Sequence, residues 1–187
     1  MIVLKDKDTV YFASAAGHYN NYQNLRPDLS DEENMHLWHL NDGLGTIVML
    51  SVQSDRITDL LRYSDVFHCD LTMEALHEIP SGIEKIFEGT NCRVHDVNTG
   101  VTVFIARGDR AFRIYSVGAV YEIEDFSSIG CCENAITVGY ELSKGIEDPM
   151  QRIKAIFNVV NAHSNHRVYP ISVINTRDNS YTLLEEG

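Results

Sequence analysis

The segment Phe126–Gly145, FSSIGCCENAITVGYELSKG, is the most informative stretch of the chain for the fold. It predicts a short strand or turn that ends at Ser127–Gly130, followed by a helix over about Cys132–Ser143 with Gly145 as the C-cap. Asp148 and Pro149 then begin another helix as N-cap and first helical residue. The segment therefore joins a strand region on its N-terminal side to a pair of helices.

The residues before this segment alternate between apolar and polar types, which is typical of antiparallel strands. We expect strands at Val101–Ala106, Ala111–Val117 and Ala119–Glu124, with glycines at their turns. Further upstream, apolar residues recur at intervals of three and four, which is the period of a helix. This spacing predicts a helix near 53–67 and a second helix over Met73–Phe87 that Pro80 can break.

The two ends of the chain also have the composition of strands. Residues 1–16 look like a hairpin, and Met35–Leu40 and Thr46–Ser51 flank an Asp-Gly turn, a strong hairpin signal. Residues 17–34 look like a long loop, and Val168–Asn175 and Tyr181–Leu184 look like closing strands. The order ββββ–αα–βββ–αα–ββ predicts an α+β protein with one domain over 1–187, in which two antiparallel sheets face each other and helix pairs lie outside.

Composition excludes several classes of protein. The chain has 187 residues, 44% of them hydrophobic and 22% charged, which suits a soluble globular protein. Its formal net charge of -12 argues against nucleic acid and against anionic membranes as partners. We find no signal peptide and no apolar run of the roughly 20 residues that span a bilayer, which favours a cytoplasmic protein. The four cysteines form no CxxC and are expected to be free thiols.

The same order and spacing resemble the four-layer αββα sandwich of N-terminal-nucleophile hydrolases, in particular proteasome β-type subunits and their bacterial two-ring relatives. Phe126–Gly145 is similar to the "IGSG…A…L" turn of that family. The hairpin Ile2–Ala16, the hairpin His36–Ser51 and the closing region Asp148–Ile174 carry the rest of the likeness. The chain departs from the family at the loop 17–34 and at Cys131-Cys132-Glu133, where the family prefers Ser-Gly-Gly.

The resemblance implies amide-bond cleavage by an N-terminal Thr, assisted by a lysine and by an aspartate on the second strand. None of the three is found at its expected place. The first strand, Met1–Leu4, contains no Thr, Ser or Cys, and no Asp occurs between Asp8 and Asp28. The lysine is expected near Met35 or His36, and no Lys occurs between Lys7 and Lys85. We therefore expect the inherited mechanism to be absent.

Three other residues are candidate nucleophiles, namely Thr9, Cys131 and Ser14. Cleavage after Asp8 would expose Thr9 as a new N-terminal residue, but it would also delete the first strand. Cys131 could act as a nucleophile at the start of a helix, where a thiolate is stabilised; a small packed residue is the favoured interpretation. Ser14 with His18 or His36 could form a hydrolytic pair, although no orienting acid or oxyanion hole is evident.

Metal and phosphate sites are not expected. His163 and His166 could share a helix face, but no further ligand adjoins them, so a helix-capping role is favoured. His36 and His39 point to opposite faces of a strand. Residues 68–70, His-Cys-Asp, lie at a helix end, where an ordinary structural role is favoured, and the glycines at 43 and 45 belong to a hairpin. We expect no metal and no cofactor.

The sequence thus predicts a non-catalytic proteasome-like protein that acts as a self-assembling scaffold or a binding module. The resemblance implies a homo-oligomer, as a ring or stacked rings built through outer helices. A peptide or small molecule could occupy the region between the sheets, whose predicted lining is Met1, Ser14, Ala15, His36, Gly45 and Cys131. The alternative is a divergent threonine- or cysteine-dependent amide hydrolase, and a third possibility is an inactive partner within a larger hetero-assembly.

Overall fold

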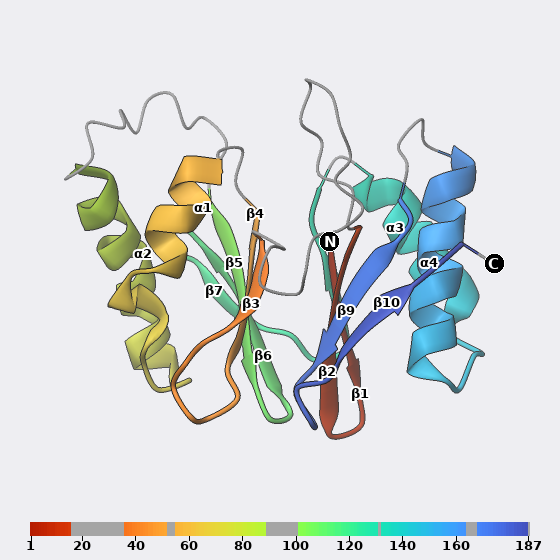
Figure 1. Ribbon diagram of the computed structural model, residues 1–187, viewed down its shortest axis with the longest axis horizontal. Helices are drawn as coiled ribbons and strands as arrows, with labels where there is room; N and C mark the ends of the chain where they lie inside the picture. Colours follow the sequence, from red (N-terminus) through yellow and green to blue (C-terminus); the bar gives the residue numbers. More distant parts are fainter. Residues whose placement is uncertain (16–35, 52–54, 89–100, 131, 164–167, 187) are drawn as a thin grey trace.

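A computed structural model describes residues 1–15, 36–51, 55–88, 101–130, 132–163 and 168–186. Figure 1 shows four layers: a helix layer, two β-sheets and a second helix layer. The predicted α+β sandwich with helix pairs outside is therefore confirmed. Among the described residues, none of the helices is both long enough and apolar enough to cross a membrane.

The first sheet is built from the two ends of the chain. Its five strands run in the order β10-β9-β2-β1-β8, and every neighbouring pair is antiparallel. Their bounds are β1 Ile2–Asp6, β2 Thr9–Ala15, β8 Phe126–Ser128, β9 Ile171–Asn175 and β10 Tyr181–Leu184. The predicted first hairpin and the predicted closing strands are confirmed by this arrangement.

The second sheet is built from the middle of the chain. Its order is β3-β4-β5-β6-β7, again antiparallel throughout. Their bounds are β3 Leu37–His39, β4 Ile47–Ser51, β5 Thr102–Arg107, β6 Arg110–Tyr115 and β7 Val120–Glu122. The segment between β7 and β8 carries the chain from the second sheet to the first.

Each sheet is covered on its outer face by its own helices. The helix α1 (Asp55–Arg62), the short 3₁₀ helix η2 (Asp65–Phe67) and α2 (Met73–Glu88) pack on the second sheet, and α3 (Glu133–Ser143) and α4 (Pro149–His163) pack on the first. A third apolar cluster fills the space between the sheets. This division follows from the strands, whose alternate residues face the helices or the opposite sheet.

Three helix boundaries differ from the sequence predictions. The helix expected near 53–67 ends at Arg62, and Ser64 caps a separate 3₁₀ turn by accepting a hydrogen bond from Val66. The helix α2 runs through Pro80 without a break, because its apolar face is anchored on both sides of that residue. The C-cap of α3 is Lys144, and Gly145 follows it.

The sandwich has two distinct ends. Met1 and the last residue of β2 lie at one end, which we call the Met1 end. The tight turns that close the β1–β2, β3–β4, β5–β6 and β9–β10 pairs lie at the opposite end, the turn end. There Thr176 donates a hydrogen bond through its hydroxyl to the carbonyl of Gly108, which ties the first sheet to the second.

Candidate functional site

The Met1 end brings together residues that are far apart in the sequence. The amino group of Met1 donates to the carbonyl of Ile129 over 3.1 Å, and the amide of Ile129 donates back to the Met1 carbonyl over 3.0 Å. Met1 and Ile129 both pack against the cluster between the sheets. The start of β1 is therefore held between β2 and the turn that leads into α3.

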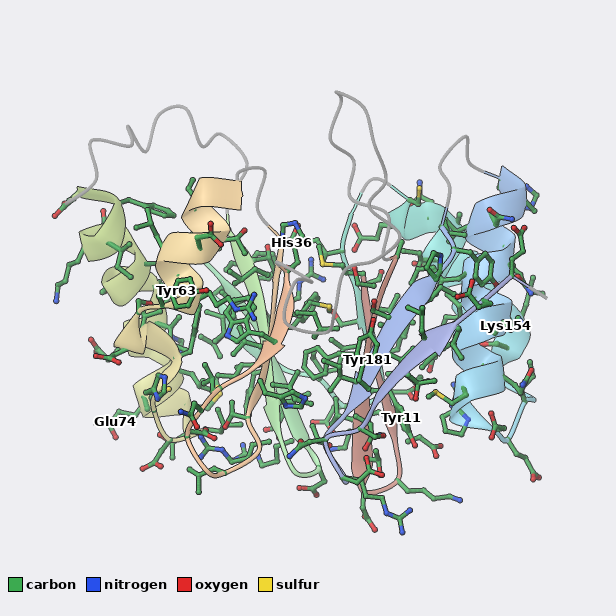
Figure 2. The ribbon with its side chains drawn as sticks, in the orientation of Figure 1. Tyr11, His36, Tyr63, Glu74, Lys154 and Tyr181 are labelled. Atoms are coloured by element: carbon green, nitrogen blue, oxygen red, sulfur yellow. The ribbon has the colours of Figure 1, made fainter. Side chains whose placement is uncertain are left out.

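The neighbouring wall on the first sheet carries hydroxyl groups. Ser14 pairs with Ser172 across β2 and β9, and both side chains are buried. The hydroxyl oxygens of Ser172 and Tyr181 are 2.9 Å apart, and Figure 2 shows Tyr181 between the two sheets. Ser14 donates its hydroxyl proton to the carbonyl of Ala15 over 3.3 Å. The chain neighbours of Ser14 are both alanines, so neither of them can orient its hydroxyl as an acid would.

The facing wall on the second sheet is mostly apolar. The strand registers place five residues side by side in the order Leu37, Met49, Phe104, Arg113, Tyr121. Leu37, Met49 and Phe104 are completely buried in the cluster between the sheets. Arg113 is the cation of this row, and its side chain is 18% exposed. The positive charge of this row is therefore on β6, at Arg113, and not on β3, whose member of the row is Leu37.

The predicted lining residues face in different directions. Ala15 packs against the apolar cluster under α3 and α4, whereas Ser14 lies on the strand's other face. His36 accepts a hydrogen bond through its carbonyl from the amide of Leu50 over 2.7 Å, and Leu50 belongs to the cluster under α1 and α2. Figure 2 shows His36 at the Met1 end. Cys131 lies outside the described residues.

Gly45 and Thr9 lie at the turn end, away from Met1. Gly45 has a φ of +71°, and a Cβ on it would lie 2.9 Å from Nδ2 of Asn179 in the β9–β10 turn. Thr9 is buried and pairs with Asp6 next to the β1–β2 turn. The structure therefore groups Met1, Ser14, Ala15 and His36 at one end and separates Gly45 and Thr9 from them.

The histidines and cysteines that are candidates for reactive or metal-binding groups are scattered. His163 is the last residue of α4, and His166 lies outside the described residues. Burial raises the pKa of the Cys69 thiol above its ordinary value, although the charge of Arg107 opposes the shift, and a raised pKa disfavours the reactive thiolate. Within the described ranges, His, Cys, Asp and Glu side chains form no group of three that could hold a metal ion.

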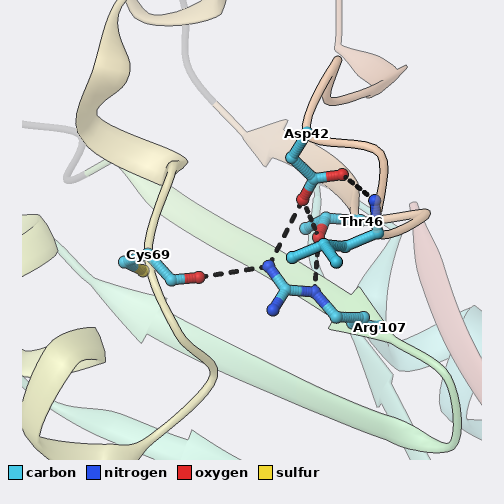
Figure 3. Close-up of polar contacts among 5 residues, drawn as sticks. Asp42, Thr46, Cys69 and Arg107 are labelled. Carbon is cyan, nitrogen blue, oxygen red and sulfur yellow. Dashed lines mark hydrogen bonds and ion pairs between the residues drawn. The ribbon is translucent and has the colours of Figure 1, made fainter.

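A polar cluster at the turn end was not predicted from the sequence (Figure 3). Arg107 donates to the Thr46 hydroxyl over 2.7 Å, to the Asp42 carboxylate over 3.3 Å and to the Cys69 carbonyl over 3.1 Å. Burial alone would raise the pKa of Asp42, but hydrogen bonds from Thr46 and Leu44 outweigh it and lower that pKa. This cluster anchors the β3–β4 turn against the segment before α2, which is a structural role.

Comparison with solved structures identifies the fold. Thiobacillus denitrificans BPH in complex with epoxomicin matches with a TM-score of 0.72 at 10% identity, covering 99% of this chain and 98% of that one. Anbu (ancestral beta-subunit) from Yersinia bercovieri matches with a TM-score of 0.65 at 14% identity, covering 99% of this chain and 86% of that one.

The chain has a proteasome β-subunit-like fold. At these identities the likeness concerns the fold alone, because one fold carries many functions. No family model matches the sequence, and no curated protein matches it either. Within the proteasome β-subunit-like fold, function must therefore be argued from the residues at the Met1 end.

Proposed function

We propose that this chain is a non-catalytic, single-domain member of the proteasome β-subunit-like fold that assembles with itself in the cytoplasm. The observation that carries the proposal is the chemistry of the Met1 end. The positions where the family resemblance implies a nucleophile and an aspartate hold Met1 and Ala15. The resemblance implies a lysine near Met35 or His36, and the next residue, Leu37, begins β3 and is buried among apolar side chains.

The surroundings of Met1 would not activate a nucleophile. Met1, Leu37, Met49 and Ile129 make this part of the inter-sheet region apolar. An activated Thr needs a base and a nearby cation in hydrogen-bond reach. The cation of the inter-sheet region, Arg113, is engaged with Ser127 and Glu133 instead. The polar groups nearby are the hydroxyls of Ser14, Ser172 and Tyr181, and none of them is a cation. The Ser14 hydroxyl already donates its proton to the backbone carbonyl of Ala15. This arrangement favours a structural or binding role over amide hydrolysis.

The alternative that uses Thr9 conflicts with the sheet. Removing residues 1–8 would delete β1, which pairs on one side with β2 and on the other with β8. The deletion would leave β2 and β8 without the strand between them and remove the buried residues Ile2, Val3 and Leu4 from the core. The loss of this strand and of its buried side chains argues against Thr9 as a processed N-terminus.

Self-assembly is supported by a second apolar stripe on α3. One face of α3 is buried against α4 and the first sheet. On another face, Val138 and Leu142 lie one turn apart and are 52% and 73% exposed. Large exposed apolar residues that are neighbours on a helix indicate an interaction surface rather than scattered exposure. We infer that a second copy of the chain covers this stripe, as the family resemblance implies for outer helices.

A peptide or small molecule remains the proposed ligand of the Met1 end. Met1, Ser14 and His36 lie there, whereas Ala15 faces the α3–α4 side, and the buried hydroxyls of Ser172 and Tyr181 add hydrogen-bonding capacity beside Ser14. Because the inter-sheet core is packed with apolar side chains, the ligand would contact the rim of this end rather than the middle of the sandwich.

The catalytic question is tested by covalent labelling. The full chain is incubated separately with epoxomicin and with phenylmethylsulfonyl fluoride, and its intact mass is then measured. The proposal predicts no added mass with either compound and no hydrolysis of peptide amides. A stoichiometric adduct that maps to Thr9 or Cys131 would contradict it and establish the hydrolase alternative.

A further inference from the structure

Arg113 makes contacts between the two sheets that the proposed function does not use. It stands on β6, on the face toward the first sheet, and its Nη1 donates to the Ser127 hydroxyl on β8 over 3.3 Å. The same Nη1 lies 3.9 Å from the carboxylate of Glu133, the first residue of α3. One side chain of the second sheet therefore holds both a strand of the first sheet and the start of a helix that covers it.

Contacts within its own sheet fix the guanidinium in place. Its Cζ lies 4.7 Å from the ring centroid of Tyr115 and 5.6 Å from that of Phe104. Such cation–π contacts orient an arginine side chain. If the sheets separate locally, Arg113 keeps both rings and loses only Ser127 and Glu133. The cross-sheet contacts can thus break and re-form without repacking the second sheet.

The opposite end of the sandwich is tied independently. The Thr176 hydroxyl donates to the carbonyl of Gly108 there, and Gly45 packs closely on Asn179. The residues between β7 and β8 also join the sheets covalently, with Lys5 donating its amide to the carbonyl of Asp125. Local separation of the sheets would therefore begin at the Met1 end.

We propose that Arg113 is the contact that keeps the Met1 end closed, and that its release from Ser127 and Glu133 opens this end while the turn end stays intact. Opening would bring water to the apolar residues beside the site, Met1 and Ile129. Because the side chain of Glu133 is 51% exposed, dissolved salt screens its attraction to Arg113. The closed state is therefore weakened by salt.

Hydrogen–deuterium exchange on the full chain tests the proposal. In Arg113→Met, the amides of Ile129 and Ile136, which donate to Met1 and Cys132, are expected to exchange about tenfold faster. The amides of Val10 and Thr176 at the turn end should keep their wild-type rates. In wild type, about 0.5 M salt should accelerate Ile129 and Ile136 selectively, and in Arg113→Met it should have no such effect.

Arg110→Met is the matched control. Arg110 lies on the same strand and also combines an ion pair with an aromatic contact, but it binds Glu122 and the Leu71 carbonyl, outside the first sheet. The Arg110→Met variant should leave the exchange rates of the Ile129 and Ile136 amides unchanged. Equal acceleration at both ends in Arg113→Met, the same pattern in Arg110→Met, or no salt effect in wild type would overturn the proposal. If Arg113→Met does not fold, Glu133→Gln, which alters an exposed residue, must accelerate the same two amides.

Discussion

Gly139 of α3 lies directly against the backbone of Ile156 in α4. A Cβ on Gly139 would stand 2.8 Å from the Ile156 carbonyl oxygen and 2.9 Å from its Cα. Backbone atoms cannot move aside as the end of a flexible side chain can. The distance between the two helices that cover the first sheet is therefore set by the absence of a side chain at this position.

Gly139→Ala is expected to destabilise the protein. The added methyl group forces α3 and α4 apart, and overpacking of this kind costs about 1–3 kcal/mol. Urea unfolding followed by far-UV circular dichroism measures the change. Gly145→Ala is the matched control, because a Cβ there meets nothing within 4 Å. A Gly139→Ala variant as stable as Gly145→Ala would contradict the close approach of the helices.

Tyr140 is expected to titrate at unusually high pH. Burial, followed by its hydrogen bond to Asp125 and the charge of that carboxylate, raises the pKa of Tyr140 to about 12. Asp125→Asn removes the charge and should move this pKa downward toward that of an ordinary tyrosine. The ultraviolet absorbance of the phenolate follows the titration, and subtraction of a Tyr140→Phe titration isolates this residue. An unchanged titration in Asp125→Asn would refute the assignment.

The sign of the resulting pH dependence follows from linkage. The pKa of Tyr140 is higher in the folded state than in the unfolded state, so the folded state holds its proton more tightly. Its contribution to stability is complete below the ordinary tyrosine pKa and is lost as the pH rises toward about 12. The free energy of unfolding should therefore fall in this window more steeply for wild type than for Tyr140→Phe.

Asp42→Asn is expected to weaken the turn-end cluster. The variant loses the ion pair with Arg107 and part of the hydrogen bonding to Thr46, which costs about 1–3 kcal/mol at neutral pH. Because the folded-state pKa of Asp42 is lowered, its contribution is present above the ordinary aspartate pKa and is lost as the pH falls through the folded value. The stability gap between wild type and variant, measured by urea unfolding, should therefore narrow in acid. A gap that stays constant with pH would argue against the ion pair.

Leu142→Ser combined with Val138→Ser is expected to weaken self-association. Both side chains are exposed in the single chain, so the stability of the protomer should change by no more than about 0.5 kcal/mol. The dissociation constant of the assembly should rise by about tenfold or more, measured by sedimentation velocity over a concentration series. Tyr63→Ser, which alters an 84% exposed aromatic beyond α1, is the control that should leave association unchanged. An equal rise of the dissociation constant in Tyr63→Ser and in the α3 double variant would contradict the proposal that α3 forms the interface.

The sandwich was predictable because each layer has a local signal. The two-residue period of the strands, the Asp-Gly turn and the Asp148–Pro149 helix start all depend on residues that are close in sequence. Pro80 indicates a helix break by its local effect, which the burial of its neighbours outweighs. In the structure, Leu76, Ile79, Ile83 and Phe87 are buried on the second sheet. Burial of each such side chain contributes about 1.5–3 kcal/mol, enough together to offset a lost helix hydrogen bond.

The site was less predictable because its contacts join distant parts of the chain. Arg107 and Asp42 are 65 residues apart, and the sequence around either residue does not predict the other as its partner. Arg113 was missed although its alternation with Ala111 and Tyr115 places it on an inward face. Gly45 was predicted to line the same region as Met1, but its turn lies at the opposite end of the sandwich. The absence of a nucleophile, an aspartate and a lysine at their expected positions, in contrast, could be recognised from the sequence alone.

The measurement that tests the central claim most directly is native mass spectrometry of the protein, followed by the intact mass of the same sample after denaturation. The account predicts an assembly of several uncleaved chains, each with the 21.1 kDa mass of this sequence. Extra mass on each subunit would identify a retained ligand. A chain shortened by its first eight residues would expose Thr9 as an N-terminal nucleophile and contradict the account.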